Sequence, residues 1–89
     1  MIRQHVVVRG MVQGVGYRYS CEHRARELGV RGWVRNRNDG AVEAVFEGDD
    51  AAVARMMGWA RNGPPGALVS DLDVNDEEPR GETRFDIRF

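Results

Sequence analysis

Polar and apolar residues alternate with the two-residue period of a β-strand in several short stretches of this chain. Residues 4–10 carry Val6 and Val8 on one face of such a strand and His5, Val7 and Arg9 on the other. Two further stretches of the same kind, 30–37 and 41–47, are separated by Asn38-Asp39-Gly40. An Asp-Gly pair between two such stretches is typical of a hairpin turn, so we predict that they form a β-hairpin.

The second half of the chain contains two more strand-like stretches. Residues 68–75 form one of them, and we expect Leu68, Leu72 and Val74 to face the interior. The other is the stretch 85–89, in which apolar and charged residues alternate without exception. A turn at Pro79-Arg80-Gly81 separates the two.

Two stretches have apolar residues at the three- and four-residue spacing of an α-helix. The first, 18–28, is followed by Gly29, which occupies a position where helices commonly end. The second begins at Gly48-Asp49-Asp50, which supplies an N-cap and an acidic first turn, and ends near Gly63, because Pro64 cannot continue a helix. The two apolar helix faces are expected to comprise Tyr17, Cys21, Ala25 and Leu28 in the first, and Val53, Met56, Met57 and Ala60 in the second.

The predicted order is therefore β-α-β-β-α-β with a short additional strand at the C-terminus. This order is that of the split βαβ, or ferredoxin-like, arrangement, an α+β fold in which two helices cover one face of a mostly antiparallel sheet. A length of 89 residues corresponds to a single domain, 1–89. A right-handed crossover makes strand 30–37 parallel to strand 4–10, so both strands end at the same edge of the sheet.

The segment between the first strand and the first helix is suited to binding a small anion. Gly14 and Gly16 can reach positive φ without steric cost, which allows successive backbone N–H groups to turn toward one point. The start of a helix adds unpaired N–H groups and the positive end of its dipole. Arg18 adds a permanent positive charge whose planar shape matches a phosphate group. Asn36 lies close to the end of the parallel strand, at the same edge, so we expect it to lie near Arg18.

Composition excludes several classes of function. The net charge of −1 gives no overall attraction to nucleic acid or to acidic membranes. All 13 basic residues are arginines, so the chain has neither a Schiff-base lysine nor the lysine of a nucleotide-binding phosphate loop. The single Cys21 rules out an internal disulfide, and one cysteine with two histidines argues against a structural zinc site.

No stretch of the sequence predicts a membrane span or a secretory leader. No apolar run approaches the about 20 residues that a spanning helix needs, and no long apolar stretch follows a basic start. We therefore expect a cytoplasmic protein with no membrane partner and no nucleic-acid partner. A monomer is the simplest expectation for its oligomeric state.

Residues 10–18 and 32–40 together resemble the acylphosphatase family, and the resemblance continues through Val42-Glu43 and residues 63–67. It covers essentially the whole chain and implies metal-independent hydrolysis of a small acyl phosphate, with no cofactor. It also implies that Arg18 and the loop backbone bind the phosphate and that Asn36 positions the attacking water. The loop residues concerned are Val12, Gln13, Gly14, Val15, Gly16 and Tyr17. Two positions depart from some family members: Arg37, where a hydroxyl residue can stand, and Gly16, where some have cysteine.

Other proteins with this topology suggest alternative functions. An RNA-binding module displays stacking aromatic and basic residues on its central strands, whereas strand 41–47 lacks that pattern and carries acidic residues. A metal-carrier domain needs paired cysteines, which this chain does not have. The remaining alternative is a non-catalytic module that binds an anion for regulation. Arg9, Arg35 and Arg37 could add positive potential near the loop, although a solvated surface position is the default for an arginine.

Overall fold

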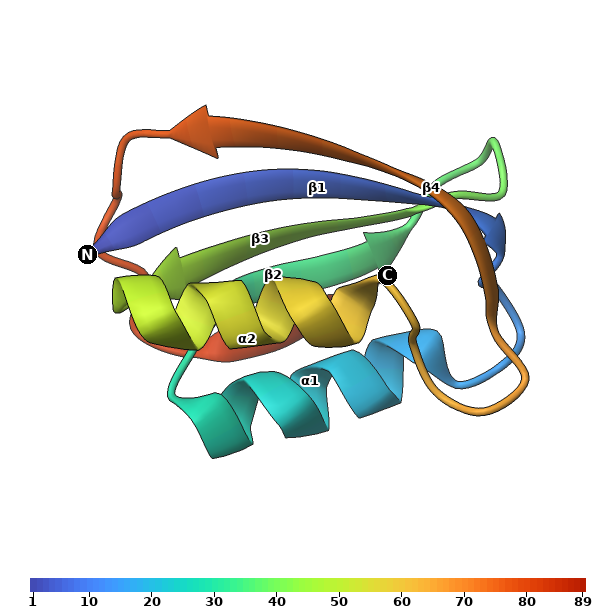
Figure 1. Cartoon of the computed structure of the whole chain (residues 1–89), viewed down its shortest axis with the longest axis horizontal. Helices are drawn as coiled ribbons and strands as arrows, with labels where there is room; N and C mark the ends of the chain where they lie inside the picture. Colours follow the sequence, from blue (N-terminus) through green and yellow to red (C-terminus); the bar gives the residue numbers. More distant parts are fainter.

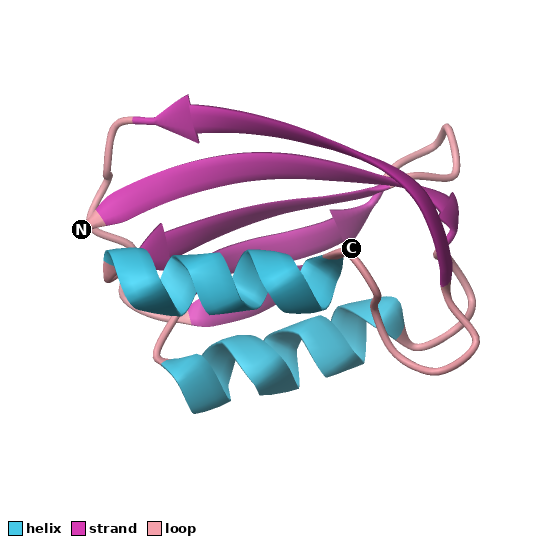
Figure 2. Ribbon diagram, in the orientation of Figure 1, coloured by secondary structure: helices cyan, strands magenta, loops and turns pink.

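A computed structural model describes all 89 residues of the chain as one sheet covered by a layer of two helices (Figures 1 and 2). The strands lie in the order β4-β1-β3-β2-β5. The elements are β1 (Ile2–Met11), α1 (Tyr17–Leu28), β2 (Arg31–Asn36), β3 (Val42–Gly48), α2 (Asp50–Ala60), β4 (Leu68–Glu77) and β5 (Phe85–Arg88). This is the predicted ferredoxin-like fold with its additional C-terminal strand. No helix has the length and apolar character needed to cross a membrane.

Strand β3 lies between β1 and β2 and is antiparallel to both. Strands β1 and β2 consequently run in the same direction without touching, and both end at the same edge of the sheet (Figure 1). The loop that follows β1 and the hairpin that follows β2 therefore start side by side. The expectation that the two strands are parallel is confirmed, and this placement determines where the functional site forms.

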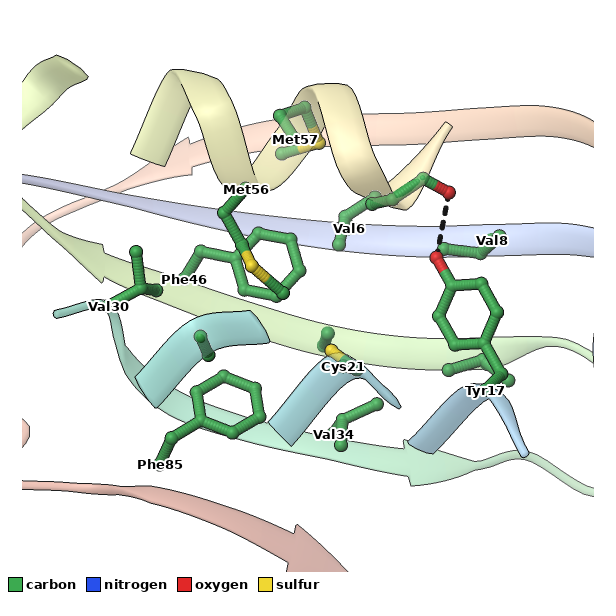
Figure 3. Close-up of a cluster of buried hydrophobic side chains, with 14 of the residues drawn as sticks. Val6, Val8, Tyr17, Cys21, Val30, Val34, Phe46, Met56, Met57 and Phe85 are labelled. Atoms are coloured by element: carbon green, nitrogen blue, oxygen red, sulfur yellow. Dashed lines mark hydrogen bonds between the residues drawn. The ribbon is translucent and has the colours of Figure 1, made fainter. Parts of the chain in front are cut away.

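The core lies between the sheet and the helix layer (Figure 3). It is built from the predicted faces, because alternate residues of a strand and every third or fourth residue of a helix point the same way. Burial of each large apolar side chain contributes about 1.5–3 kcal/mol. The fully buried members include Val6 and Val8 of β1, Cys21 and Ala25 of α1, Val42 and Phe46 of β3, Met56 and Ala60 of α2, and Phe85 of β5.

The prediction for β4 is wrong at two of its three inward positions. Leu72 packs against the core, but Leu68 and Val74 are exposed. A β-bulge between Arg9 and Gly10 changes the register, so that Arg9 faces Asp71 and Gly10 faces Val69. The unpaired residue between them reverses the inward face of β4, and Val69 packs against the core in place of Leu68. Val74 is exposed because β4 is an edge strand and the helices pack chiefly over its neighbours.

Glycine is required at this bulge. Gly10 has φ +126°, and a Cβ atom there would lie 2.1 Å from the carbonyl oxygen of Leu68. Any other residue would have to push the two strands apart where β1 leads into the loop. The bulge therefore fixes the direction in which the chain leaves the sheet.

The face of the sheet that carries no helix holds a buried ionic cluster that the sequence pattern did not predict. Arg3 is 2% exposed and Glu47 is 1% exposed. The Arg3 guanidinium donates to Glu47, Glu77 and Glu82. Glu47 also accepts hydrogen bonds from the backbone N–H groups of Arg80 and Glu82, at 2.8 and 2.7 Å. This Arg3 cluster ties the β4–β5 connection to the middle of the sheet.

Candidate active site

The loop between β1 and α1 has the backbone geometry predicted for an anion cradle. Gly14 and Gly16 adopt φ values of 77° and 79°, in the left-handed region that glycine reaches without strain. Gly16 is the N-cap of α1, and no side chain caps the helix there. The first turn of α1 also contains no acidic residue. The positive end of the helix dipole is thus neither capped nor neutralised by the protein itself.

The backbone N–H groups of residues 12–19 make no hydrogen bond within the protein. Unpaired N–H groups are expected in the first turn of a helix, but here they extend back through the whole loop. Such a series of free donors around two left-handed glycines forms a concave site for an anion. The loop offers hydrogen bonds that only an external group can accept.

Arg18 and Asn36 line the same pocket, which has a volume of about 170 Å³. Arg18 comes from the first turn of α1, and Asn36 is the last residue of β2. The two residues are 18 positions apart in the sequence, and the parallel course of β1 and β2 brings them together as expected. The lining of this phosphate-sized pocket comprises Val12, Gly14, Gly16, Tyr17, Arg18, Tyr19 and Asn36.

The pocket lining differs from the sequence-based description at three residues, two in the loop and one in α1. Gln13 and Val15 do not contribute to its lining, whereas Tyr19, which the sequence analysis did not single out, does. Tyr19 belongs to no recognisable motif. The only feature of the sequence that could have indicated its role is its position beside Arg18 in the first helical turn. An aromatic side chain therefore forms part of the pocket wall.

The Gln13 side chain fastens the loop to the β2–β3 hairpin. Its Nε2 donates to the carbonyl oxygens of Arg37 and Ala41, at 2.8 and 3.0 Å. Arg37 directly follows Asn36, so these two hydrogen bonds couple the position of the N–H cradle to that of the asparagine. The Gln13 side chain thus holds together the two halves of the pocket.

Tyr17 connects the pocket to the core. Its hydroxyl donates to the carbonyl oxygen of Ala60 at 2.8 Å (Figure 3). The Tyr17 ring lies 5.1 Å from that of Trp59. Burial raises the pKa of the Tyr17 phenol, so the hydroxyl keeps its proton and remains a donor. The backbone of Tyr17 lines the pocket while its side chain joins the start of α1 to the end of α2.

Arg18 differs in charge pairing from the other arginines at this edge of the sheet. Arg35 lies 2.6 Å from Glu43, Arg37 lies 2.9 Å from Asp39, and Arg9 lies 3.6 Å from the same aspartate. Arg18 pairs with no carboxylate, and its guanidinium carbon lies 4.8 Å from the centre of the Phe89 ring. The positive charge of Arg18 is consequently available to a ligand, and the charges of its neighbours are compensated.

No group of three or more histidine, cysteine, aspartate or glutamate side chains is arranged to hold a metal ion. The donors in the pocket are backbone N–H groups, one guanidinium and one carboxamide. Donors of this kind bind the oxygens of a phosphate or carboxylate. Fold and pocket together define a class: a small ferredoxin-like domain with an anion-binding pocket at the edge of its sheet.

Comparison with known proteins identifies the family within that class. The Acylphosphatase family profile matches residues 4–87. An acylphosphatase of Haloquadratum walsbyi is 56% identical over 86 residues, which are 97% of this chain and 92% of the relative. An acylphosphatase of Trichormus variabilis is 52% identical over 88 residues, 99% of this chain and 87% of the relative. The chain belongs to the acylphosphatase family.

The fold agrees with this assignment. The crystal structure of acylphosphatase from Bacillus subtilis superposes with a TM-score of 0.96 at 37% identity, and the match covers 100% of both chains. The chain is thus an enzyme of this family, which hydrolyses acyl phosphates. This finding favours an enzyme over the non-catalytic anion-binding module that the sequence left as an alternative.

Proposed function

We propose that this enzyme hydrolyses its acyl phosphate substrate without a metal ion, using the pocket between the β1–α1 loop and the end of β2. The backbone N–H groups of residues 12–17 and the Arg18 guanidinium hold the phosphate, and Asn36 positions the attacking water. The oxygen of the water bonds to phosphorus as the bond from phosphorus to the acyl oxygen breaks. The bonding electrons leave with the carboxylate, and the protons of the water stay on phosphate or pass to solvent.

The chemistry of the leaving group explains why so few side chains suffice. A carboxylic acid has a pKa of about 4–5, so the carboxylate leaves at neutral pH without a proton. The pocket contains no carboxyl, imidazole or thiol group that could serve as a general acid. An alkyl phosphate would release an alkoxide, which needs a proton donor, and no carboxyl, imidazole or thiol group lines the pocket to provide one. The pocket therefore suits acyl phosphates.

Arg18 is assigned the role of stabilising charge. Phosphoryl transfer passes through a loose transition state with negative charge on the equatorial oxygens, and donors already fixed in place stabilise it best. A guanidinium is charged in proteins under ordinary conditions, and that of Arg18 lies against Phe89 with no carboxylate partner to give up. Its charge therefore requires no rearrangement before it meets the phosphate.

Asn36 is assigned the role of orienting the water. Its carboxamide has one acceptor oxygen and two donor hydrogens, so it can accept a hydrogen bond from the water and donate to another group. A carboxamide is too weak a base to take the proton, so its contribution lies in the direction of attack. The presence of Asn36 and Arg18 in one small pocket with the free N–H groups is the observation that carries this proposal.

The test is a steady-state assay of acetyl phosphate hydrolysis in the presence of a chelator. The unmodified enzyme is expected to keep its full rate, because no step uses a metal. Arg18→Gln should lose most phosphate binding and about 100-fold or more in rate. Arg55→Gln, which removes the same charge from the exposed face of α2, is the matched control and should leave the rate unchanged.

Asn36→Ala should lose turnover by a similar factor and keep its fold and its inhibition by inorganic phosphate. Asn38→Ala, in the exposed hairpin turn two residues further on, is the corresponding control. Full turnover in Asn36→Ala would remove the role given to that side chain. A rate that disappears with the chelator would contradict the metal-independent route.

We further infer that the active unit is a monomer, since one chain supplies every residue of the pocket. Cys21 is a free thiol in the core, and burial raises its pKa, which keeps it protonated and unreactive. A free cysteine suits a reducing compartment, in keeping with a cytoplasmic location.

A further inference from the structure

Two hollows adjoin the phosphate-sized pocket, and each shares a different residue with it. The sheet-side hollow, of about 620 Å³, shares Asn36. The helix-side groove, of about 440 Å³, shares Tyr19. The sheet-side hollow is lined mainly by charged and polar residues of the β2–β3 hairpin, together with Phe89. The helix-side groove is lined by Tyr19, Ser20, His23, Arg24, Glu27 and Trp59.

Asn36 and Tyr19 line the pocket from two different elements, the sheet and the outer face of α1. Residues two apart on a helix point about 200° from each other. The side chain of Tyr17 points into the core, toward the sheet, so the side chain of Tyr19 points away from the sheet. Tyr19 is accordingly 63% exposed. Asn36 belongs to the sheet itself, at the end of β2.

The in-line geometry of phosphoryl transfer assigns these two residues to the two ends of the reaction. The attacking and leaving oxygens lie on opposite sides of phosphorus. If the water is held by Asn36, as proposed above, the bond to the acyl oxygen points toward Tyr19. This step rests on the proposed function, because it takes the position of the water from the role of Asn36.

We propose that Tyr19 is a specificity-determining residue that contacts the acyl group, and that the helix-side groove favours acyl phosphates with an apolar, ring-sized substituent. The aromatic surface of the groove comes from Tyr19 and Trp59. Trp59 is half-buried and its ring is braced against Tyr17 at 5.1 Å, which gives the groove a fixed floor. The sheet-side hollow offers charged hairpin side chains instead, including Asp39 and Glu43.

The charged residues of the groove do not oppose this assignment. Glu27 lies 3.4 Å from Arg24 and 3.7 Å from His23. The Arg24 guanidinium thus accompanies this carboxylate, and little unbalanced negative charge faces the departing carboxylate product. The aromatic rings remain as the feature of the groove that distinguishes one acyl group from another.

The test compares benzoyl phosphate, which carries a ring, with acetyl phosphate, which carries a methyl group. Tyr19→Ala should lower kcat/KM for benzoyl phosphate about tenfold, mainly by raising KM, because an apolar contact of this size contributes a factor of that order. The loss for acetyl phosphate should be clearly smaller, because a methyl group offers the ring much less contact area. Tyr19→Phe keeps the ring and should keep the ratio of kcat/KM for benzoyl phosphate to kcat/KM for acetyl phosphate.

Phe89→Ala is the matched variant on the sheet side. Phe89 is 91% exposed and its ring lies against Arg18, so removing it should affect both substrates equally through the guanidinium. Equal losses for both substrates in Tyr19→Ala would overturn the proposal, as would a selective loss in Phe89→Ala. The proposed function is tested by a different result. If it is wrong, Asn36→Ala keeps its turnover, and this outcome does not depend on the Tyr19 variants.

Discussion

At the scale of single residues, Tyr17 belongs to the pocket and to the core at once. Its N–H group is one of the free donors of the loop, while its hydroxyl is buried against the carbonyl oxygen of Ala60. That carbonyl accepts no other hydrogen bond within the protein. The helix start that carries Arg18 is therefore held by a contact deep in the interior.

Tyr17→Phe should lower the free energy of unfolding by about 1–2 kcal/mol, because it leaves the buried carbonyl of Ala60 without a partner. The rate of acetyl phosphate hydrolysis should change little while the protein is folded, since the backbone of residue 17 stays in place. Urea denaturation measures the first effect. Tyr19→Phe, which removes an exposed hydroxyl that makes no hydrogen bond within the protein, is the control and should leave stability unchanged. Equal stability of the two variants would contradict the structural role of the Tyr17 hydroxyl.

At the scale of elements, the pocket depends on how the β1–α1 loop is joined to the β2–β3 hairpin. The Gln13 side chain makes that connection through Arg37 and Ala41. The N–H cradle could keep its shape without this link, but its distance from Asn36 would no longer be fixed. Positioning effects of this kind act on rate more than on stability.

Gln13→Ala should lower kcat/KM for acetyl phosphate about tenfold, because the water and the phosphate lose their fixed relative position. The free energy of unfolding should change by about 0.5 kcal/mol or less, as is usual for an exposed side chain. The measurement combines the kinetic assay with denaturation. Gln4→Ala removes a comparable exposed contact, 3.0 Å to Asp76, far from the loop, and should keep full activity. An unimpaired Gln13→Ala enzyme would show that the cradle needs no such anchor.

The sequence predicted the order and kind of every element, because the periods of two and 3.6 residues are strong in this chain. It also predicted that Arg18 and Asn36 approach each other, since that follows from the direction of two parallel strands. It did not predict the inward face of β4, because a bulge at Gly10 depends on the partner strand. The contacts of Gln13 escaped it for the same reason, as they join segments whose spacing exists only in the folded chain.

At the scale of the whole molecule, the Arg3 cluster links the β4–β5 connection to the middle of the sheet. Burial opposes ionisation of Glu47, but the N–H groups of Arg80 and Glu82 and the guanidinium of Arg3 outweigh it and lower its pKa. The hydrogen bond from Arg3 likewise lowers the pKa of Glu77. Both carboxylates are thus more acidic in the folded protein than in the unfolded chain. The sequence pattern did not predict this cluster, because the pattern does not show which charges pair across strands.

Stability should therefore fall in acid. A carboxylate with a lowered pKa contributes fully above its ordinary value, 4.5 for glutamate, and its contribution is lost as the pH falls through the lower folded value. Urea denaturation across a pH series should show a constant free energy of unfolding near neutral pH and a decline below about pH 4.5.

Glu47→Gln should lose about 3 kcal/mol at neutral pH, because it breaks a buried pair, and should show a shallower decline in acid. Asp86→Asn, which removes the exposed partner of Arg84, is the control and should cost about 0.5 kcal/mol or less. An acid decline equally steep in Glu47→Gln and in the unmodified protein would show that the decline does not originate in Glu47.

The position of β3 between β1 and β2 has a kinetic consequence. The N–H cradle follows β1 and Asn36 ends β2, and these two strands are not paired with each other. The two halves of the pocket therefore come together only when β3 pairs with both strands. The helices could form, and much of the chain could collapse, before the active site is assembled. During refolding, the rate at which hydrolytic activity returns would therefore report the rate at which β3 pairs with β1 and β2. A spectroscopic signal from the helices alone would not detect this step.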